Sequence, residues 1–316
     1  MKKIIIILAT TIIPLLSFSQ SLLLKSRIID KNSKLGIPFS NIWVLSKDIG
    51  TNSLENGDFV LLVDSTILMN EKLKITAIGY YDTIIDIKNI KFPIYLHPRV
   101  YKIQEVTVFP NKKNSFVVNP INKKTHLGYM LSSNVPIIMC RYFPYSEQYL
   151  KNEFISKIIV YTRKSLRKHK FNIHIYEYDT TTNKPGRELV NKATTVSTKA
   201  ELGFGISKNV LDLSKNRITY PKTGLVVGVE WIMNYENFFE EEVNEKNGGI
   251  NAKFFEKRFG PDFAITYENS PIRWTYDKGF WINDDWIKWA YSKKGFQVKG
   301  TSLIALTPAI SIILTD

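Results

Sequence analysis

Apolar and polar residues alternate along several stretches of the chain with the two-residue period of a β-strand. Two stretches show this most clearly, KLKITAIG at residues 72–79 and FNIHIYEY at residues 171–178. We expect the positions that face a core to be Leu73, Ile75, Ala77, Phe171, Ile173 and Ile175. The opposite, outward faces then hold Lys72, Lys74, Thr76, Asn172 and His174.

The stretch GDFVLLV at residues 57–63 is apolar on both faces, and we expect Phe59, Leu61 and Val63 on the inner one. The run GLVVGVEWI at residues 224–232 is continuous and bounded by glycine, which is typical of a central strand covered on both faces. Gly, Asn, Asp and Pro separate the runs, and Asn56-Gly57 and Gly79 mark a tight turn and a strand end. Many short strands at this spacing predict an all-β protein built from β-sandwiches. The strongest candidate for helix is the acidic stretch NFFEEEVNEKNGG at residues 237–249.

The beginning of the chain has the pattern of a signal peptide, expected at residues 1–19. A short basic region precedes an apolar run at residues 4–16, and small residues follow at Ser17 and Ser19. Cleavage would then place Gln20 at the new N-terminus. An uncleaved membrane anchor is the alternative, although the run is shorter than a comfortable span and contains a proline.

The remaining length suits two domains. A polar, basic and proline-containing stretch at residues 110–125 is predicted to be a linker. We therefore expect a first β-sandwich at residues 20–109 and a second, larger β-sandwich at residues 126–316.

Charge and cysteine content narrow the possible partners. The chain has 43 basic and 29 acidic residues, a formal net charge of +14, which could favour anionic lipids or glycans. The expected export argues against nucleic acid as a partner. The densest basic run is RKSLRKHK at residues 163–170, read here as a solvated hairpin loop. Cys140 is the single cysteine, which excludes an intramolecular disulfide and is expected to be a buried thiol.

Ordered sequence features of residues 22–109 carry a resemblance to a known family. They are IIDKNSKLGIPFSNIWV, GTNSLENGDFVL, LKITAIGYYD, PIYLHP and IQEVTV. This part resembles the carboxypeptidase regulatory-like domain, a transthyretin-like Greek-key β-sandwich. The resemblance implies a non-catalytic accessory domain of a Gram-negative cell envelope, in the periplasm, at the outer membrane or on the surface. Two further stretches are FNIHIYEYDTTTNKPGRELV and VLDLSKNRITYPKTGLVVGVEWI. Through them, residues from 110 onward resemble, more loosely, the larger jelly-roll-like sandwich that accompanies this domain in short envelope proteins.

Few patterns suggest catalysis. The spelling HIYE places His174 and Glu177 as in zinc carboxypeptidases, but positions three apart on a strand face opposite sides. Nucleophile-elbow, P-loop and dinucleotide glycine patterns are absent from the sequence. We therefore expect no catalytic residue, no metal site and no cofactor, and we classify the protein as a non-enzyme.

The stretch RWTYDKGFWINDDWIKWAY at residues 273–291 is rich in aromatic side chains beside Asp and Asn. Such a set could stack on sugar rings and bind their hydroxyl groups. The candidate ligand-binding residues are Trp274, Trp281, Asp284, Trp286 and Trp289. The alternative is a core strand and hairpin whose tryptophans fill the seam between two sheets.

Together these features predict an exported binding or assembly module that contacts an envelope protein or a glycan. Peripheral contact with anionic envelope lipids is a further expectation from the charge. A carbohydrate-binding module and a hydrolase remain as alternatives. Exposed, coplanar tryptophans beside a groove would favour the former, and two carboxylates facing each other across a cleft would favour the latter.

Overall fold

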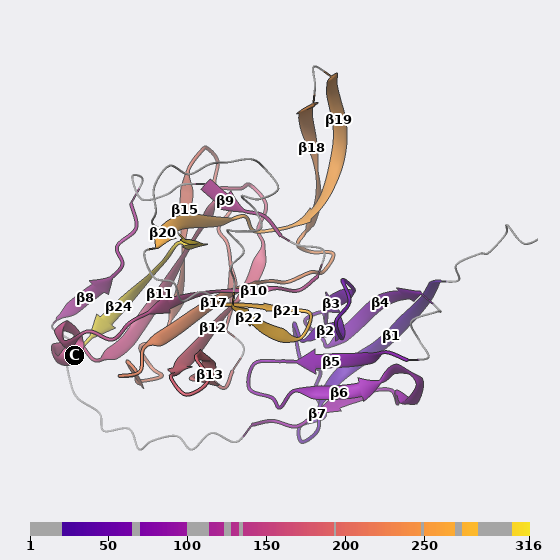
Figure 1. The fold of residues 1–316 in the computed structure, drawn as a ribbon, viewed down its shortest axis with the longest axis horizontal. Coiled ribbons are helices and arrows are strands. Elements are labelled where there is room, and N and C mark those ends of the chain that lie inside the picture. Colours follow the sequence, from indigo (N-terminus) through magenta and orange to yellow (C-terminus); the bar gives the residue numbers. More distant parts are fainter. Residues whose placement is uncertain are drawn as a thin grey trace, which may run out of the picture.

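The computed structural model describes residues 21–64, 70–99, 114–122, 128–132, 135–192, 194–247, 250–268, 274–283 and 305–316. In these ranges every long element is a β-strand, and the helical pieces are two short 3-10 turns, η2 (Ile87–Asn89) and η3 (Glu147–Lys151). Two β-sandwiches and a projecting hairpin make up the fold (Figure 1). The all-β prediction is therefore confirmed. No helix in the described ranges is long and apolar enough to cross a membrane.

The first domain consists of β1 (Ser21–Asp30), β2 (Asn41–Val44), β3 (Gly50–Asn52), β4 (Asp58–Asp64), β5 (Lys72–Thr76), β6 (Thr83–Asp86) and β7 (Ile94–Leu96). One sheet has the order β4-β1-β7 and the other the order β3-β2-β5-β6. A single apolar core joins them, shared by Phe59 and Leu61 of β4, Ile42 of β2, and Leu73 and Ile75 of β5. Burial alternates along β4 and β5, as the sequence pattern predicts.

Two glycines hold the turns of this domain. Gly57 has a φ of 86° and lies in the turn before β4, and Gly79 has the same φ after β5. A side chain at Gly57 would meet the carbonyl oxygen of Ile28, and one at Gly79 would meet that of Asn191. Both positions thus need glycine for the left-handed backbone and for the close approach of another chain segment.

The second domain also has two sheets with one shared core. The seven-stranded sheet contains β10 (Ile138–Phe143), β12 (Lys170–Asp179), β13 (Lys184–Glu188), β14 (Thr195–Ser197), β17 (Leu225–Trp231), β21 (Trp274–Asp277) and β22 (Phe280–Asn283). The eight-stranded sheet contains β8 (Ser115–Val118), β9 (Gly128–Met130), β11 (Phe154–Arg163), β15 (Ile206–Asp212), β16 (Ile218–Thr219), β20 (Phe263–Glu268), β23 (Ala305–Pro308) and β24 (Ile310–Thr315). Phe171, Ile173 and Ile175 of β12 lie in the common core, opposite Ile158 and Ile312.

Part of the expected linker is structural. Residues 115–118 form β8, which pairs antiparallel with β24 inside the eight-stranded sheet. The expectation of a linker is wrong for these four residues, because they pair with a strand from a distant part of the sequence. Residues 110–113 and 123–125 lie outside the described residues, as does the expected signal peptide.

The acidic stretch that was the strongest candidate for helix forms a strand. β18 (Phe238–Asn247) pairs along its whole length with β19 (Ile250–Phe259) and forms an arm that projects from the body (Figure 1). Cross-strand ion pairs join its two charged strands, with Lys253 Nζ 2.6 Å from Glu242 Oε1 and Arg258 paired to Glu241. The following basic segment supplies these partners, so the local acidic pattern does not need a helix.

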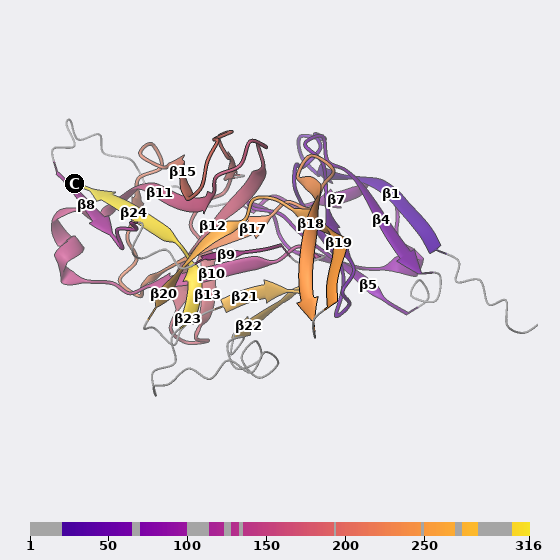
Figure 2. The same ribbon diagram turned by 90° about the horizontal axis from the view of Figure 1, so that it is seen from above.

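The two domains lie side by side along the long axis of the molecule (Figure 2). The seven-stranded sheet turns one face to its own core and the other toward β2 of the first domain. Trp43 of β2 is completely buried in this contact and donates from Nε1 to the Pro136 carbonyl at 3.0 Å. Its ring meets Tyr276 edge-on at 5.3 Å between centroids. The part of the outer face around Tyr276 is therefore an interface with the first domain and does not face solvent.

Candidate functional site

The aromatic candidates from the sequence do not form one exposed platform. Trp274 on β21 is only 6% exposed and packs in a cluster with Ile138 and Tyr276. Because a buried ring cannot stack on a sugar, the prediction of a ligand contact at Trp274 is wrong. Trp281 on β22 is half-buried, and Asp284, Trp286 and Trp289 lie outside the described residues. The β21–β22 hairpin agrees with the alternative reading as a core strand and hairpin.

The outward face of β12 carries a polar site. Asn172 and His174 lie opposite the core residues, as expected, but they are only 4% and 5% exposed. This outward face is buried because the first domain covers it. β17 lies beside β12 and brings Glu230 opposite Asn172, while β13 brings Glu188 opposite Tyr176.

His174 lies between two carboxylates. Its Nε2 is 2.9 Å from Glu230 Oε2, and its Nδ1 is 3.1 Å from Glu188 Oε1. The Tyr176 hydroxyl is 3.0 Å from the same Nδ1. All three ionisable side chains are at least nine-tenths buried.

The histidine in this arrangement is an imidazolium. Burial alone would lower the pKa of His174, but the charge of Glu230 and the hydrogen bonds to Glu188 and Glu230 outweigh it and raise the pKa to about 10. Both ring nitrogens then donate, one to each carboxylate. The cation thus offsets part of the negative charge that is buried between the domains.

Amide side chains extend this network into the first domain. Asn41 of β2 donates from Nδ2 to Glu230, and Asn172 donates to the other oxygen of Glu230 at 2.8 Å. Asn52 donates to Asn41 Oδ1 at 2.6 Å and accepts from the backbone nitrogen of Met233 at 2.8 Å. A continuous buried chain of hydrogen bonds therefore crosses from one domain to the other.

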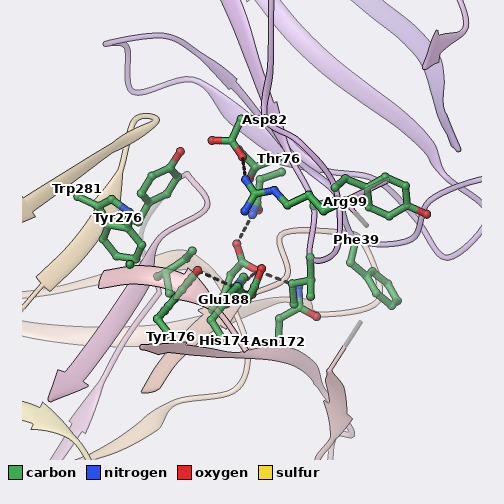
Figure 3. A pocket seen from close by; sticks show the side chains of 17 residues that line it. Phe39, Thr76, Asp82, Arg99, Asn172, His174, Tyr176, Glu188, Tyr276 and Trp281 are labelled. Atoms are coloured by element: carbon green, nitrogen blue, oxygen red, sulfur yellow. Dashed lines mark hydrogen bonds and ion pairs between the residues drawn. The ribbon is translucent and has the colours of Figure 1, made fainter. Parts of the chain in front are cut away.

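A cleft of about 130 Å³ opens above this network, between β5 of the first domain and β12 of the second (Figure 3). Its wall includes Arg99, Asp82 and Trp281, with Tyr276 beside them. Asp82 is paired with Arg99 at 3.5 Å and with Lys74 at 3.4 Å. A second hollow of about 260 Å³ lies next to it, and both are lined by Phe39, Ala77, Ile78, Tyr80 and Asn172.

Two donors on residues that line the cleft have no acceptor among the described residues. They are the Tyr276 hydroxyl and Arg99 Nε, and both atoms are buried. Tyr276 is itself only 6% exposed, and burial raises the pKa of its hydroxyl, so the group remains a neutral donor. Leaving a buried donor unsatisfied costs about 1–3 kcal/mol, so the cleft is suited to a group that accepts hydrogen bonds.

The described residues do not support a metal or thiol site. His174 is engaged on both nitrogens, and Glu177 instead pairs with Arg187 at 3.0 Å on the surface. No cluster of His, Cys, Asp and Glu in the described part could hold a metal ion. Cys140 is buried, as expected, and its burial raises the pKa of the thiol far above neutrality.

Comparisons with known proteins give no further identification. No protein-family model matches the chain, and no curated protein matches it. The site residues that the sequence analysis missed are Asn41, Asp82, Arg99, Glu188, Glu230 and Tyr276. The sequence could have indicated Glu230, because it is the single charged residue in the apolar run GLVVGVEWI. A charge buried in such a strand needs a partner.

Proposed function

We propose that the protein is a non-catalytic binding or assembly module of a Gram-negative cell envelope, with its ligand site in the cleft between the two domains. We further propose that the first domain is of the carboxypeptidase regulatory-like type and that residues 1–19 direct export. The ordered motifs of residues 22–109 and the basic, apolar and small-residue pattern at the chain start support these assignments.

The observation that carries the proposal is the pair of unsatisfied donors on residues that line the cleft. Tyr276 and Arg99 both line the cleft, and the Tyr276 hydroxyl and the Arg99 Nε–H are without a protein acceptor in the described residues. The cavity is smaller than the volume of about 300–1,000 Å³ typical of sites that enclose a whole small molecule. It therefore suits one acceptor-bearing group of a larger ligand, such as a terminal sugar or a carboxylate side chain.

The carboxylates beneath the cleft favour binding over hydrolysis. Glu188 and Glu230 both line the cleft, as a pair of catalytic carboxylates would. Each of them, however, is held by the same imidazolium, and Glu230 also accepts from Asn41 and Asn172. A general acid or base must be able to exchange a proton with a substrate, and these contacts occupy the groups that would do so.

A carbohydrate ligand is the second candidate, and Trp281 is the observation in its favour. This half-buried tryptophan lines the cleft and meets Tyr276 edge-on at 4.8 Å and Tyr176 edge-on at 5.4 Å between centroids. An aromatic wall beside Arg99 and Asp82 is the combination that sugar sites use. The ligand contact is thus expected at Trp281 and not at Trp274.

The test is an array of envelope glycans and peptides probed with the mature chain, residues 20–316, followed by titration of any hit. Tyr276→Phe removes the unsatisfied hydroxyl and keeps the ring, so it should weaken binding about two- to tenfold, the value of one hydrogen bond. Trp281→Ala should weaken it further if the ligand is a sugar.

The matched control is Tyr178→Phe. Tyr178 is also buried on β12, but its hydroxyl donates to Asn183 at 3.3 Å and it does not line the cleft. Its removal should leave the affinity unchanged. Equal affinities of Tyr276→Phe, Trp281→Ala and the unmodified protein would refute the cleft as the ligand site.

A further inference from the structure

Two neighbouring loops of the second domain expose large apolar side chains. Leu166 lies in the loop between β11 and β12 and is 68% exposed. Leu202 and Phe204 lie in the loop between β14 and β15 and are 80% and fully exposed. Isolated exposed leucines need no explanation, but three such residues on adjoining loops form a patch.

Backbone contacts hold the two loops together. Ser165 forms a parallel bridge with Ala200, and its carbonyl accepts from the Glu201 nitrogen at 2.8 Å. The Lys164 nitrogen donates to the Gly205 carbonyl at 3.0 Å. The three apolar residues are therefore neighbours of paired backbone segments and belong to one surface, here called the loop patch.

Cations surround the loop patch. Segments 163–169 and 198–205 contain Arg163, Lys164, Arg167, Lys168 and Lys199, with Glu201 as their single carboxylate. Glu201 is neutralised by Lys164 at 3.6 Å and also accepts from the Ser207 hydroxyl. Arg167, Lys168 and Lys199 lie on the surface within three positions of an apolar tip. Such a surface is complementary to an anionic membrane. The basic side chains contact the lipid headgroups, and the apolar side chains enter the boundary between headgroups and acyl chains.

We propose that the loop patch is a membrane-contact site that inserts Leu166, Leu202 and Phe204 into the surface of an anionic bilayer. Arg167 and Lys168 of the basic run, together with Lys199, then provide attraction to the headgroups, while Arg163 is paired with Asp262 at 3.2 Å. The site is separate from the cleft, since none of its residues lines the cleft.

The experiment is co-sedimentation of the mature chain, residues 20–316, with vesicles of phosphatidylcholine alone and of phosphatidylcholine with phosphatidylglycerol. The protein should sediment with the anionic vesicles and lose this binding as salt is raised. The double variant Leu202→Ser, Phe204→Ser should bind at least tenfold more weakly, because two buried apolar side chains are lost. Lys168→Gln together with Lys199→Gln should weaken binding more than tenfold at low salt, about fivefold for each charge.

Leu150→Ser is the matched control. Leu150 is 64% exposed, as the loop-patch residues are, but it lies in η3, outside the two loops of the patch. It should bind vesicles as the unmodified protein does. Thermal melting of each variant checks that the fold is retained, which is expected because all substituted side chains are exposed. Failure of the unmodified protein to bind anionic vesicles, or equal binding by the Leu202 and Phe204 variant, would overturn the proposal.

Discussion

Replacing Glu230 by glutamine removes one charge from the network between the domains while keeping the size of the side chain. Glu230 is completely buried and accepts hydrogen bonds from Asn41, Asn172 and His174. In Glu230→Gln the new NH2 group is a donor, so it cannot accept the hydrogen bonds that the carboxylate oxygen accepted at that position. The His174 imidazolium then keeps only Glu188 as a counter-ion. Breaking a buried ion pair by removing one partner costs about 3–5 kcal/mol, so this loss of unfolding free energy is expected.

The cost should depend on pH in a defined direction. The pKa of His174 is raised from 6.5 to about 10 in the folded protein, so its stabilising contribution is complete below pH 6.5 and is lost as pH rises toward 10. The substitution removes the charge that contributes most to this increase, so the pKa of His174 falls in the variant. The difference in stability should therefore be largest at pH 6 and smaller at pH 9.

Urea unfolding followed by tryptophan fluorescence at both pH values measures this difference. The control is Glu177→Gln, because Glu177 pairs with Arg187 at 3.0 Å with both side chains partly exposed. That surface pair should contribute only about 0–1 kcal/mol. A cost for Glu230→Gln below about 1 kcal/mol at pH 6, or a difference that grows with pH, would refute the assignment of a buried imidazolium.

Three further predictions test other parts of the structure. Mass spectrometry of the protein recovered from cells should give an N-terminus at Gln20, and a product that begins at Met1 would contradict export by signal cleavage. Gly79→Ala should lower the unfolding free energy by about 1 kcal/mol or more, measured by urea titration, since Gly79 has a φ of 86° and lies against the Asn191 carbonyl of the other domain. Trp274→Ala should cost about 3–5 kcal/mol in thermal melting, and a neutral effect would show that the ring is not part of the core.

The sequence pattern predicts the strands and the inward residues well. Alternation at 72–76 and 171–178 is a local property, and it correctly identifies Leu73, Ile75 and Phe171 as core. Glycine positions are equally local, because the left-handed backbone at Gly57 and Gly79 follows from the turn itself. These features need no knowledge of distant contacts.

The site could not be predicted in the same way, because it depends on what covers a strand. Periodicity places His174 on the face opposite the core but does not show that β2 of the first domain packs over that face. The strand at the acidic stretch beginning at Asn237 could not be predicted for a related reason. Its partner strand, β19, supplies the opposite charges that stabilise the hairpin. The lone Glu230 in an apolar run is the local sign that a buried partner exists.

The position of β24 also has a consequence for how the second domain reaches its native state. β24 pairs with β11 on one side and β8 on the other, and Asn119 donates to the Ile310 carbonyl across 191 positions of sequence. The chain must lose the entropy of closing a large loop before such distant contacts stabilise it, so folding is expected to be slow. Until β24 arrives, β8 and β11 each have an unpaired edge that can join another chain. Unfolded protein should therefore refold with higher yield at low concentration, where the strand inserts before two chains meet.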